Sequence, residues 1–408
     1  MNYKWDNNLK IYVINGILYS IMFNLYSPFA AKFLERLGGS EFEMSLFNAL
    51  PGLIAVFATL PGTFLVARCY NKKKVTALFF FISRIMLLTF VFVPMLPGYI
   101  MPIVFVTLFS LRNFPEAVSQ TAFQSFSGDL FSPEERSTAI SLRSKFSIPA
   151  TLLVTCVAGL ILSKLTSSHA QVMNIYQIFF TIACAIGIIE IIVFMLFKEP
   201  QKVCVKDTNF RQTLKNVFEN KKFRSFTIPS LLFYFTWQMG WPLFNIYQII
   251  NLGADEWWLS LITIFSSVGM FTGYSFWNRL IKEKGNHFVI WVSTMGMAVN
   301  PIIMAFSPNL YAATILNLFI GFFIAGTATV LLNYLLEVTP VENRVVYIGV
   351  YNTLVNVSLA ISPFAAHFVL INSNIYLALI VVGLARFLSS LILFMSDRKA
   401  TVNQHIDV

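Results

Sequence analysis

The chain has 408 residues, of which 57% are hydrophobic and only 12% charged, and its net charge is +10. Soluble domains average roughly 45–50% apolar and about 25% charged residues, so this chain carries more apolar surface than a water-soluble shape can bury. Its mean hydropathy of +0.69 indicates a membrane protein with many spans and leaves no stretch for a separate soluble domain.

Runs of about 20 mostly apolar residues, the length that crosses a bilayer as a helix, recur along the whole sequence. The first run follows a polar start and lacks a small-residue cleavage site, so we interpret it as a spanning helix and not as a signal peptide. The fourth, fifth and tenth runs contain polar residues. The twelve predicted spans are 11–31, 44–67, 75–97, 100–126, 138–163, 174–197, 225–250, 257–278, 287–307, 309–335, 346–371 and 374–396.

Lysine and arginine are unevenly distributed between the two sides of these spans. With both termini inside, 23 of the 29 basic residues lie on the inner side, in loops or near the inner ends of spans, and the outer loops keep only Lys32, Arg36 and Lys164. Cytoplasmic loops are enriched in these residues. We therefore expect a multi-pass protein of the plasma membrane, in bacteria the inner membrane, with both termini cytoplasmic and basic loops facing anionic lipid. Nucleic-acid binding is not indicated, because the basic residues are dispersed and lack a recognition module.

Two loop sequences recur after about 210 residues, which indicates an internal repeat. DLFSPEERSTAISLRSKFSIP, after the fourth span, corresponds to EVTPVENRVVYIGVYNTLVNVSLAISP after the tenth, and FLVARCYNKKK, after the second, corresponds to SFWNRLIKEKGN after the eighth. The repeat predicts an all-α membrane protein with twelve transmembrane helices in two pseudo-symmetric six-helix bundles. The bundles are expected at 1–197 and 225–408, with a basic cytoplasmic linker at 198–224. Such paired halves with a midplane binding site are a transporter architecture.

On these features the chain resembles the major facilitator superfamily over nearly its whole length. In that family the loop after the second helix reads G-x-x-x-D-R-x-G-R-K. Here Arg68 occupies the usual Asp position of the first copy, whereas Asn278 and Arg279 stand for the Asp-Arg pair of the second. The resemblance implies that the following loop residues take part in conformational change: Arg68, Lys72, Lys73, Arg136, Asn278, Arg279 and Arg344.

The segment LRNFPEAVSQTAFQS in the fourth span places Arg112, Glu116, Gln120 and Gln124 one helical turn apart, so they share one face. Inserting a charged side chain into the hydrocarbon core of a membrane costs about 2.5–3.5 kcal/mol. Such a side chain therefore usually faces a cavity or a partner of opposite charge. We expect Arg112 and Glu116 to pair, with Glu116 accepting a proton when the pair breaks and Arg112 serving as counter-ion or anion anchor. Pro115 frees a backbone carbonyl for a ligand or water. The alternative is a pair that only neutralises itself between helices.

Three further charges lie inside predicted spans. We interpret Arg84 as an interhelical hydrogen-bond donor, and Glu190 and Arg386 as packing or snorkelling residues. Tryptophans 237 and 241 either stack against a ring-bearing substrate or belong to an interfacial aromatic belt, and the amides either contact a ligand or join helices. The predicted substrate-binding residues are Asn24, Arg112, Gln120, Gln124, Trp237, Gln238, Trp241, Asn333 and Asn356.

No nucleotide-binding or catalytic motif occurs in the chain. It has no GxxxxGK[ST], GxSxG or HExxH sequence, and its four cysteines are scattered without metal-ligand spacing. We therefore expect that the protein is not an enzyme and that it binds neither a cofactor nor a metal. We expect a monomeric secondary transporter that moves a small organic solute across the lipid bilayer by alternating access. Its transport is expected to be coupled to protons. The resemblance favours efflux. The alternatives are a sugar-type uptake symporter and a membrane sensor or lipid-translocating protein on a transporter scaffold.

Overall fold

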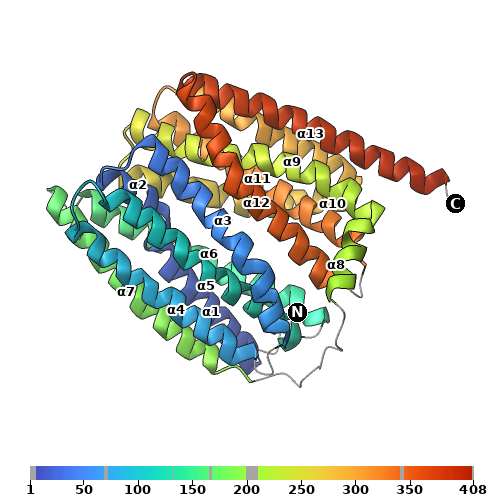
Figure 1. Cartoon of the computed structure of the whole chain (residues 1–408), viewed down its shortest axis with the longest axis horizontal. Helices are drawn as coiled ribbons and strands as arrows, with labels where there is room; N and C mark the ends of the chain where they lie inside the picture. Colours follow the sequence, from blue (N-terminus) through green and yellow to red (C-terminus); the bar gives the residue numbers. More distant parts are fainter. Residues whose placement is uncertain are drawn as a thin grey trace. The chain divides into compact units, whose positions relative to one another are not determined.

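The computed structural model describes residues 6–68, 72–131, 133–164, 168–198, 210–340 and 344–406. Every regular element within these ranges is a helix, and the described residues form no strand (Figure 1). Because apolar side chains exclude water from the spans, each backbone group there needs an internal partner, and a helix supplies it. The all-α prediction is confirmed.

The N-terminal part of the chain forms six spans. The first is broken at Leu25 and Tyr26, because Pro28 cannot donate a hydrogen bond to the carbonyl four residues before it. The elements are α1 (Asn7–Asn24), the 3-10 helix η1 (Ser27–Phe29), α2 (Ala30–Arg36), α3 (Glu41–Arg68), α4 (Lys72–Thr89), the 3-10 helix η2 (Phe90–Met95), α5 (Met101–Leu130), α6 (Pro133–Lys164) and α7 (His169–Met195).

The C-terminal part adds six more spans and one short helix that lies in the predicted linker. Helix α10 runs through both the eighth and the ninth predicted span and is interrupted at Gly285, whose φ of 80° and ψ of 167° are conformations open almost only to glycine. The elements are α8 (Phe210–Glu219), α9 (Lys221–Ile246), the π-helical turn η3 (Tyr247–Asn251), α10 (Glu256–Ala305), α11 (Leu310–Val338), α12 (Arg344–Ile371) and α13 (Ile375–Ile406).

The described helices account for the twelve predicted spans, although apolar length alone finds fewer of them. Nine described stretches are long and apolar enough to cross a membrane, with the 50 residues of α10 counted once. Helices α5 and α9 are not among the nine. Both carry the polar side chains that make them candidates for a binding site.

The chain forms two compact units. Unit 1 comprises Met1–Glu43, Phe57–Val205 and Asp255–Ser260, and unit 2 comprises Met44–Val56, Lys206–Ala254 and Leu261–Val408. In unit 1, α1 packs against α6 and α7, and α4 packs against α5 and α7 (Figure 1). In unit 2, α9 packs against α11, α12 and α13.

Phenylalanine rings fill the core of unit 1. Phe33, Phe90, Phe105 and Phe180, from α2, η2, α5 and α7, meet edge to face with ring centroids 4.9 to 5.4 Å apart. Such pairs add about 0.5–1.5 kcal/mol each beyond the burial of their area. They fix α5 and α7 against η2, which continues α4, and so determine which polar side chains of these helices meet.

An ion pair joins the first residues of α10 to α2 within unit 1. The Nε and Nη2 atoms of Arg36, at the end of α2, donate to the two carboxylate oxygens of Glu256 at 2.5 and 2.8 Å. The Tyr176 hydroxyl donates to the same carboxylate at 3.0 Å, and Glu256 is fully buried. Arg36 and Glu256 are 220 residues apart in the chain, and the sequence gives no sign of their pairing.

Candidate functional site

Three charged side chains meet inside unit 1, one from each of α4, α5 and α7. Arg84 on α4 is 0% exposed, and its Nη1 lies 2.5 Å from Oε2 of Glu116 on α5. Its Nη2 and Nε donate to Oε2 of Glu190 on α7 at 3.0 and 3.1 Å. One guanidinium therefore bridges two carboxylates, which satisfies the requirement that a charge in the bilayer interior be paired.

Polar neighbours hold the carboxylate of Glu116. The Ser83 hydroxyl donates to its Oε2 at 2.6 Å, and Gln120 Nε2 donates to its Oε1 at 3.0 Å. The contact with Gln120, one turn further along α5, shows that Glu116 and Gln120 share a face of this helix. The Glu116 side chain is 12% exposed and that of Glu190 is 1% exposed, so Glu116 is the more accessible of the two carboxylates.

The expected pair between Arg112 and Glu116 is wrong, because Glu116 is bound by Arg84 instead. Arg112 places its guanidinium carbon 5.3 Å from the ring centroid of Tyr26, and its buried Nε and Nη1 have no hydrogen-bond partner. Arg84 reaches both carboxylates because α4 lies against both α5 and α7. Gly187 on α7 makes this approach possible, since a Cβ there would lie 2.6 Å from Arg84 Cδ.

The interpretation of Arg84 as an interhelical hydrogen-bond donor is confirmed, whereas snorkelling of Glu190 and Arg386 is wrong. Glu190 is held in the interior by Arg84. Arg386 on α13 is fully buried in unit 2 and donates to the carbonyl oxygens of Thr236, Trp237 and Met297 at 3.1, 2.7 and 3.1 Å. A side chain that ends on interior carbonyls cannot extend to the membrane surface, so both residues have a packing role.

The other predicted substrate contacts are spread over both units. Asn24 donates to Ser20 O and to Thr151 Oγ1 at 2.9 and 3.2 Å, which joins α1 to α6. Gln124 lies on α5, but its side chain is outside the described residues. Asn333 on α11 and Asn356 on α12 are partly buried.

The two tryptophans of α9 lie in different environments. The Trp237 ring is buried and stacks on Tyr234 at 5.5 Å, whereas Trp241 is 40% exposed. Gln238 is buried, and its Nε2 lies 3.4 Å from the carbonyl of Val355 on α12. Its Oε1 has no hydrogen-bond partner. Within unit 2, Gln238 therefore retains an acceptor for a ligand.

The predicted loop residues are only partly described. Lys73, in the first turn of α4, donates to Phe197 O at 2.7 Å, just beyond the end of α7. Asn278 is exposed, and Arg279 is paired with Glu283 at 2.7 Å on the surface of α10. Side chains outside the described residues are those of Arg68, Lys72, Arg136 and Arg344.

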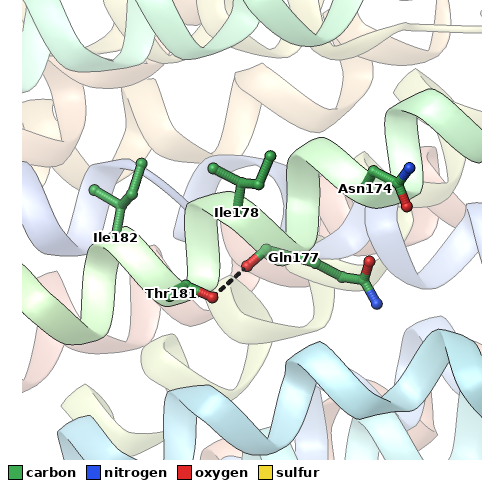
Figure 2. Close-up of a pocket in the computed structure, with 5 residues that line it drawn as sticks. All are labelled: Asn174, Gln177, Ile178, Thr181 and Ile182. Carbon is green, nitrogen blue, oxygen red and sulfur yellow. Dashed lines mark hydrogen bonds between the residues drawn. The ribbon is translucent and has the colours of Figure 1, made fainter.

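A surface depression on α7 does not contain the charged cluster. It has a volume of about 460 Å3 and is lined by one helical face, with Asn174, Gln177, Ile178, Thr181 and Ile182 (Figure 2). Gln177 is already used, since its Nε2 donates to Val91 O at 2.7 Å, and the two isoleucines are exposed. In a membrane protein, an open face with exposed isoleucines is expected to contact lipid chains. Among the described residues no group of three His, Cys, Asp or Glu side chains could hold a metal ion.

The sequence matches the family model of the Major Facilitator Superfamily over residues 12–363 and again over residues 226–405. The chain therefore belongs to this superfamily, and the resemblance found in the sequence is confirmed. It is a multi-pass membrane transporter and not an enzyme. No curated protein sequence matches the chain.

Solved transporters share the fold at low sequence identity. A mutant of the nucleoside transporter NupG is 12% identical, has a TM-score of 0.72, and is matched over 95% of this chain and 100% of its own. A bacterial homolog of the human lysosomal transporter Spinster has a TM-score of 0.67 and 12% identity, with 96% of each chain covered. A D-xylose-proton symporter has a TM-score of 0.67 and 19% identity, with 94% and 96% covered. These similarities concern the fold.

Proposed function

We propose that the chain is a proton-coupled secondary transporter that exports a small organic solute by alternating access. The observation that carries the proposal is the Glu116 carboxylate, which lies inside the membrane-spanning part yet keeps 12% of its side chain exposed. Intramembrane carboxylates paired with arginine are typical of proton relays. Glu116 is the proposed proton carrier, and Arg84 is the partner from which it separates when it is protonated.

The transport cycle is proposed to move two six-helix halves, 1–197 and 225–408, joined by the linker 198–224. The distribution of basic residues supports a plasma-membrane location with both termini cytoplasmic. We propose that the protein acts as a monomer. The proposed substrate contacts are Asn24, Arg112, Gln120, Gln124, Trp237, Gln238, Trp241, Asn333 and Asn356, and the proposed loop residues for the conformational change are Arg68, Lys72, Lys73, Arg136, Asn278, Arg279 and Arg344.

The first step of the test identifies a substrate with the purified full-length protein. Sugars, amino acids, organic anions and lipophilic cations are added at two pH values, and thermal unfolding is recorded. A ligand that binds only the folded state raises the unfolding temperature by mass action, so weak substrates register at high concentration. The ligand that does so is then used in proteoliposomes that contain a pH-sensitive dye.

The second step compares wild type with Glu116→Gln and with Glu219→Gln, a control at an exposed carboxylate of α8 that is paired with Lys215. Wild type and the control should move protons when substrate crosses the membrane. Glu116→Gln should still bind and exchange substrate but should not accumulate it in response to a pH gradient. Undiminished pH-driven accumulation by Glu116→Gln would exclude Glu116 as the proton carrier.

Uptake by symport is the second candidate function, because one structural neighbour is a D-xylose-proton symporter. The direction of the pH gradient that drives accumulation separates the two. Accumulation when the inside of the vesicle is acidic relative to its surroundings indicates exchange for protons, and the opposite gradient indicates symport. Movement of a fluorescent lipid, with no soluble solute transported, would instead support a lipid-translocating protein on this scaffold.

A further inference from the structure

Two arginines inside the described spans have buried nitrogens without a hydrogen-bond partner, Arg112 at Nε and Nη1 and Arg143 at Nη1. Arg84 bonds two carboxylates and Arg386 bonds three carbonyl oxygens. Arg112 is 4% exposed, and its buried Nε and Nη1 atoms have no hydrogen-bond partner. A buried donor without an acceptor is costly, and a charged one more so. A residue of this kind is expected where a ligand supplies the missing acceptor.

A second polar group lies beside Arg112. The guanidinium carbon of Arg112 is 5.3 Å from the ring centroid of Tyr26, and the buried Tyr26 hydroxyl has no hydrogen-bond partner besides this guanidinium. The ring is held by Phe23 and Phe180, whose centroids lie 5.9 and 6.3 Å away. Two donors of different chemistry are thus fixed side by side, one on α5 and one from the first span.

Tyr26 lies at the break in the first span, between the end of α1 and the start of η1. Interrupted helices in transporters commonly form ligand sites, because their freed backbone groups and side chains face a cavity. The break therefore supports a site at Tyr26 independently of the Arg112 geometry.

The surrounding charges favour an anion over a cation. Besides Arg112, the interior of unit 1 holds Arg84 with its partners Glu116 and Glu190, and Arg143 on α6, which lies over the rings of Tyr12 and Phe123. These five described side chains comprise three arginines and two glutamates, so they carry a net charge of +1. Both carboxylates are hydrogen-bonded to Arg84, and Arg112 acts on Glu116 only through its charge, without a hydrogen bond to it. Nε and Nη1 of Arg112 are therefore available to a negative group from outside.

We propose that Arg112 and Tyr26 form a subsite for an anionic oxygen-acid group, a carboxylate or a phosphate. The unpartnered Nε and Nη1 atoms point to different sides of the guanidinium, and each can donate a charge-assisted hydrogen bond to such a group. The Tyr26 hydroxyl supplies a further donor. This subsite deepens the proposed function, on which it rests, by assigning the transported solute to the organic anions.

The experiment measures thermal unfolding of the full-length protein in nanodiscs of neutral phosphatidylcholine, with benzoate or inorganic phosphate as probe and benzamide as the neutral match for benzoate. At least one anion should raise the unfolding temperature in a saturable way, and benzamide should not. Arg112→Gln should weaken anion binding roughly 10- to 100-fold, because a hydrogen-bonded charge pair is lost. Arg224→Gln, a control at an exposed arginine of α9, should bind as wild type does.

A second readout needs no ligand. Without added anion, Arg112→Gln should be at least as stable as wild type, because the substitution removes an unsatisfied buried charge, whereas Arg84→Gln should be less stable. The proposal is overturned if neither anion gives a saturable shift, if Arg112→Gln gives the same shift as wild type, or if it destabilises the anion-free protein as much as Arg84→Gln does.

The anionic group at the subsite comes either from a lipid headgroup or from a soluble anion. Nanodiscs that contain anionic phosphatidylglycerol distinguish these two sources. If the lipid stabilises wild type but not Arg112→Gln and abolishes the benzoate shift, a lipid headgroup occupies the subsite. If the benzoate shift persists, the site takes a soluble anion. Anion binding is read from thermal unfolding and proton coupling from the dye in proteoliposomes, so a failure of proton coupling leaves the Arg112 test unaffected.

Discussion

Replacement of Arg84 by glutamine should destabilise the protein more than any other single change in the charged cluster. Arg84 is 0% exposed and is the hydrogen-bonded cation for both Glu116 and Glu190. Removing one partner of a buried ion pair typically costs about 3–5 kcal/mol. Two carboxylates lose their partner here, but they become neutral by taking up protons, and the unfolded chain in a membrane also finds partners. We therefore expect a loss of about 3 kcal/mol.

The assay is equilibrium unfolding of the purified protein in mixed micelles, followed by tryptophan fluorescence. Arg224→Gln, at an exposed position of α9, is the control and should change the unfolding free energy by less than about 0.5 kcal/mol. The triple variant Arg84→Met, Glu116→Gln, Glu190→Gln should recover most of the lost stability, because uncharged side chains can replace a buried ion cluster at little cost.

Two results would refute this reasoning. A loss for Arg84→Gln no larger than that of Arg224→Gln would mean that the two carboxylates do not depend on the guanidinium. A triple variant as unstable as Arg84→Gln alone would mean that the side-chain volume of Arg84, and not its charge, holds α4 against α5 and α7.

Three further substitutions test separate features of the fold. Gly240→Ala should lower the unfolding temperature, because the new Cβ would overlap Nη2 of Arg386, whose hydrogen bonds to α9 would be lost; a thermal melt as in wild type would contradict this contact. Glu256→Gln weakens the partly buried pair with Arg36, whose side chain is 22% exposed, and should cost about 1–3 kcal/mol in unfolding free energy, as measured by denaturant titration. A change below about 0.5 kcal/mol would show that the pair contributes no more than a surface salt bridge. Gly285→Ala should lower the unfolding free energy by about 1–3 kcal/mol through backbone strain alone, since nothing lies within 4 Å of the added Cβ. If the variant and wild type had the same denaturation midpoint, residue 285 would not have the positive φ described above.

The sequence predicts the helices well because their main determinant is local. A run of about 20 apolar residues must cross the bilayer as a helix, wherever its neighbours lie. Polar residues then mark the segments of interest, and the spacing of Glu116 and Gln120 predicts their contact on one face of α5. Helix ends are less well predicted, as for α13, which continues to Ile406 although its apolar run ends near residue 396.

The pairing of charges is not predicted from the sequence. The four-residue spacing of Arg112 and Glu116 favours a pair within one helix, yet Glu116 binds Arg84, 32 residues away. Glu190, which is 106 residues from Arg84, joins the same guanidinium because α4 packs against both α5 and α7. The signal available in the sequence was only that each of these charges lies inside a span and therefore needs a partner.

By itself the sequence determines that this protein is a helical, multi-pass membrane protein with an internal repeat, because bilayer insertion depends on the summed hydropathy of contiguous residues. The tertiary structure alone decides which buried charges satisfy one another. That choice depends on side-chain atoms meeting within about 3 Å across helices, and such proximity is set by the packing of aromatic rings and glycines far apart in the chain. Nε and Nη1 of Arg112 remain without an acceptor for this reason, although the nearest charged residue along the helix is only one turn away.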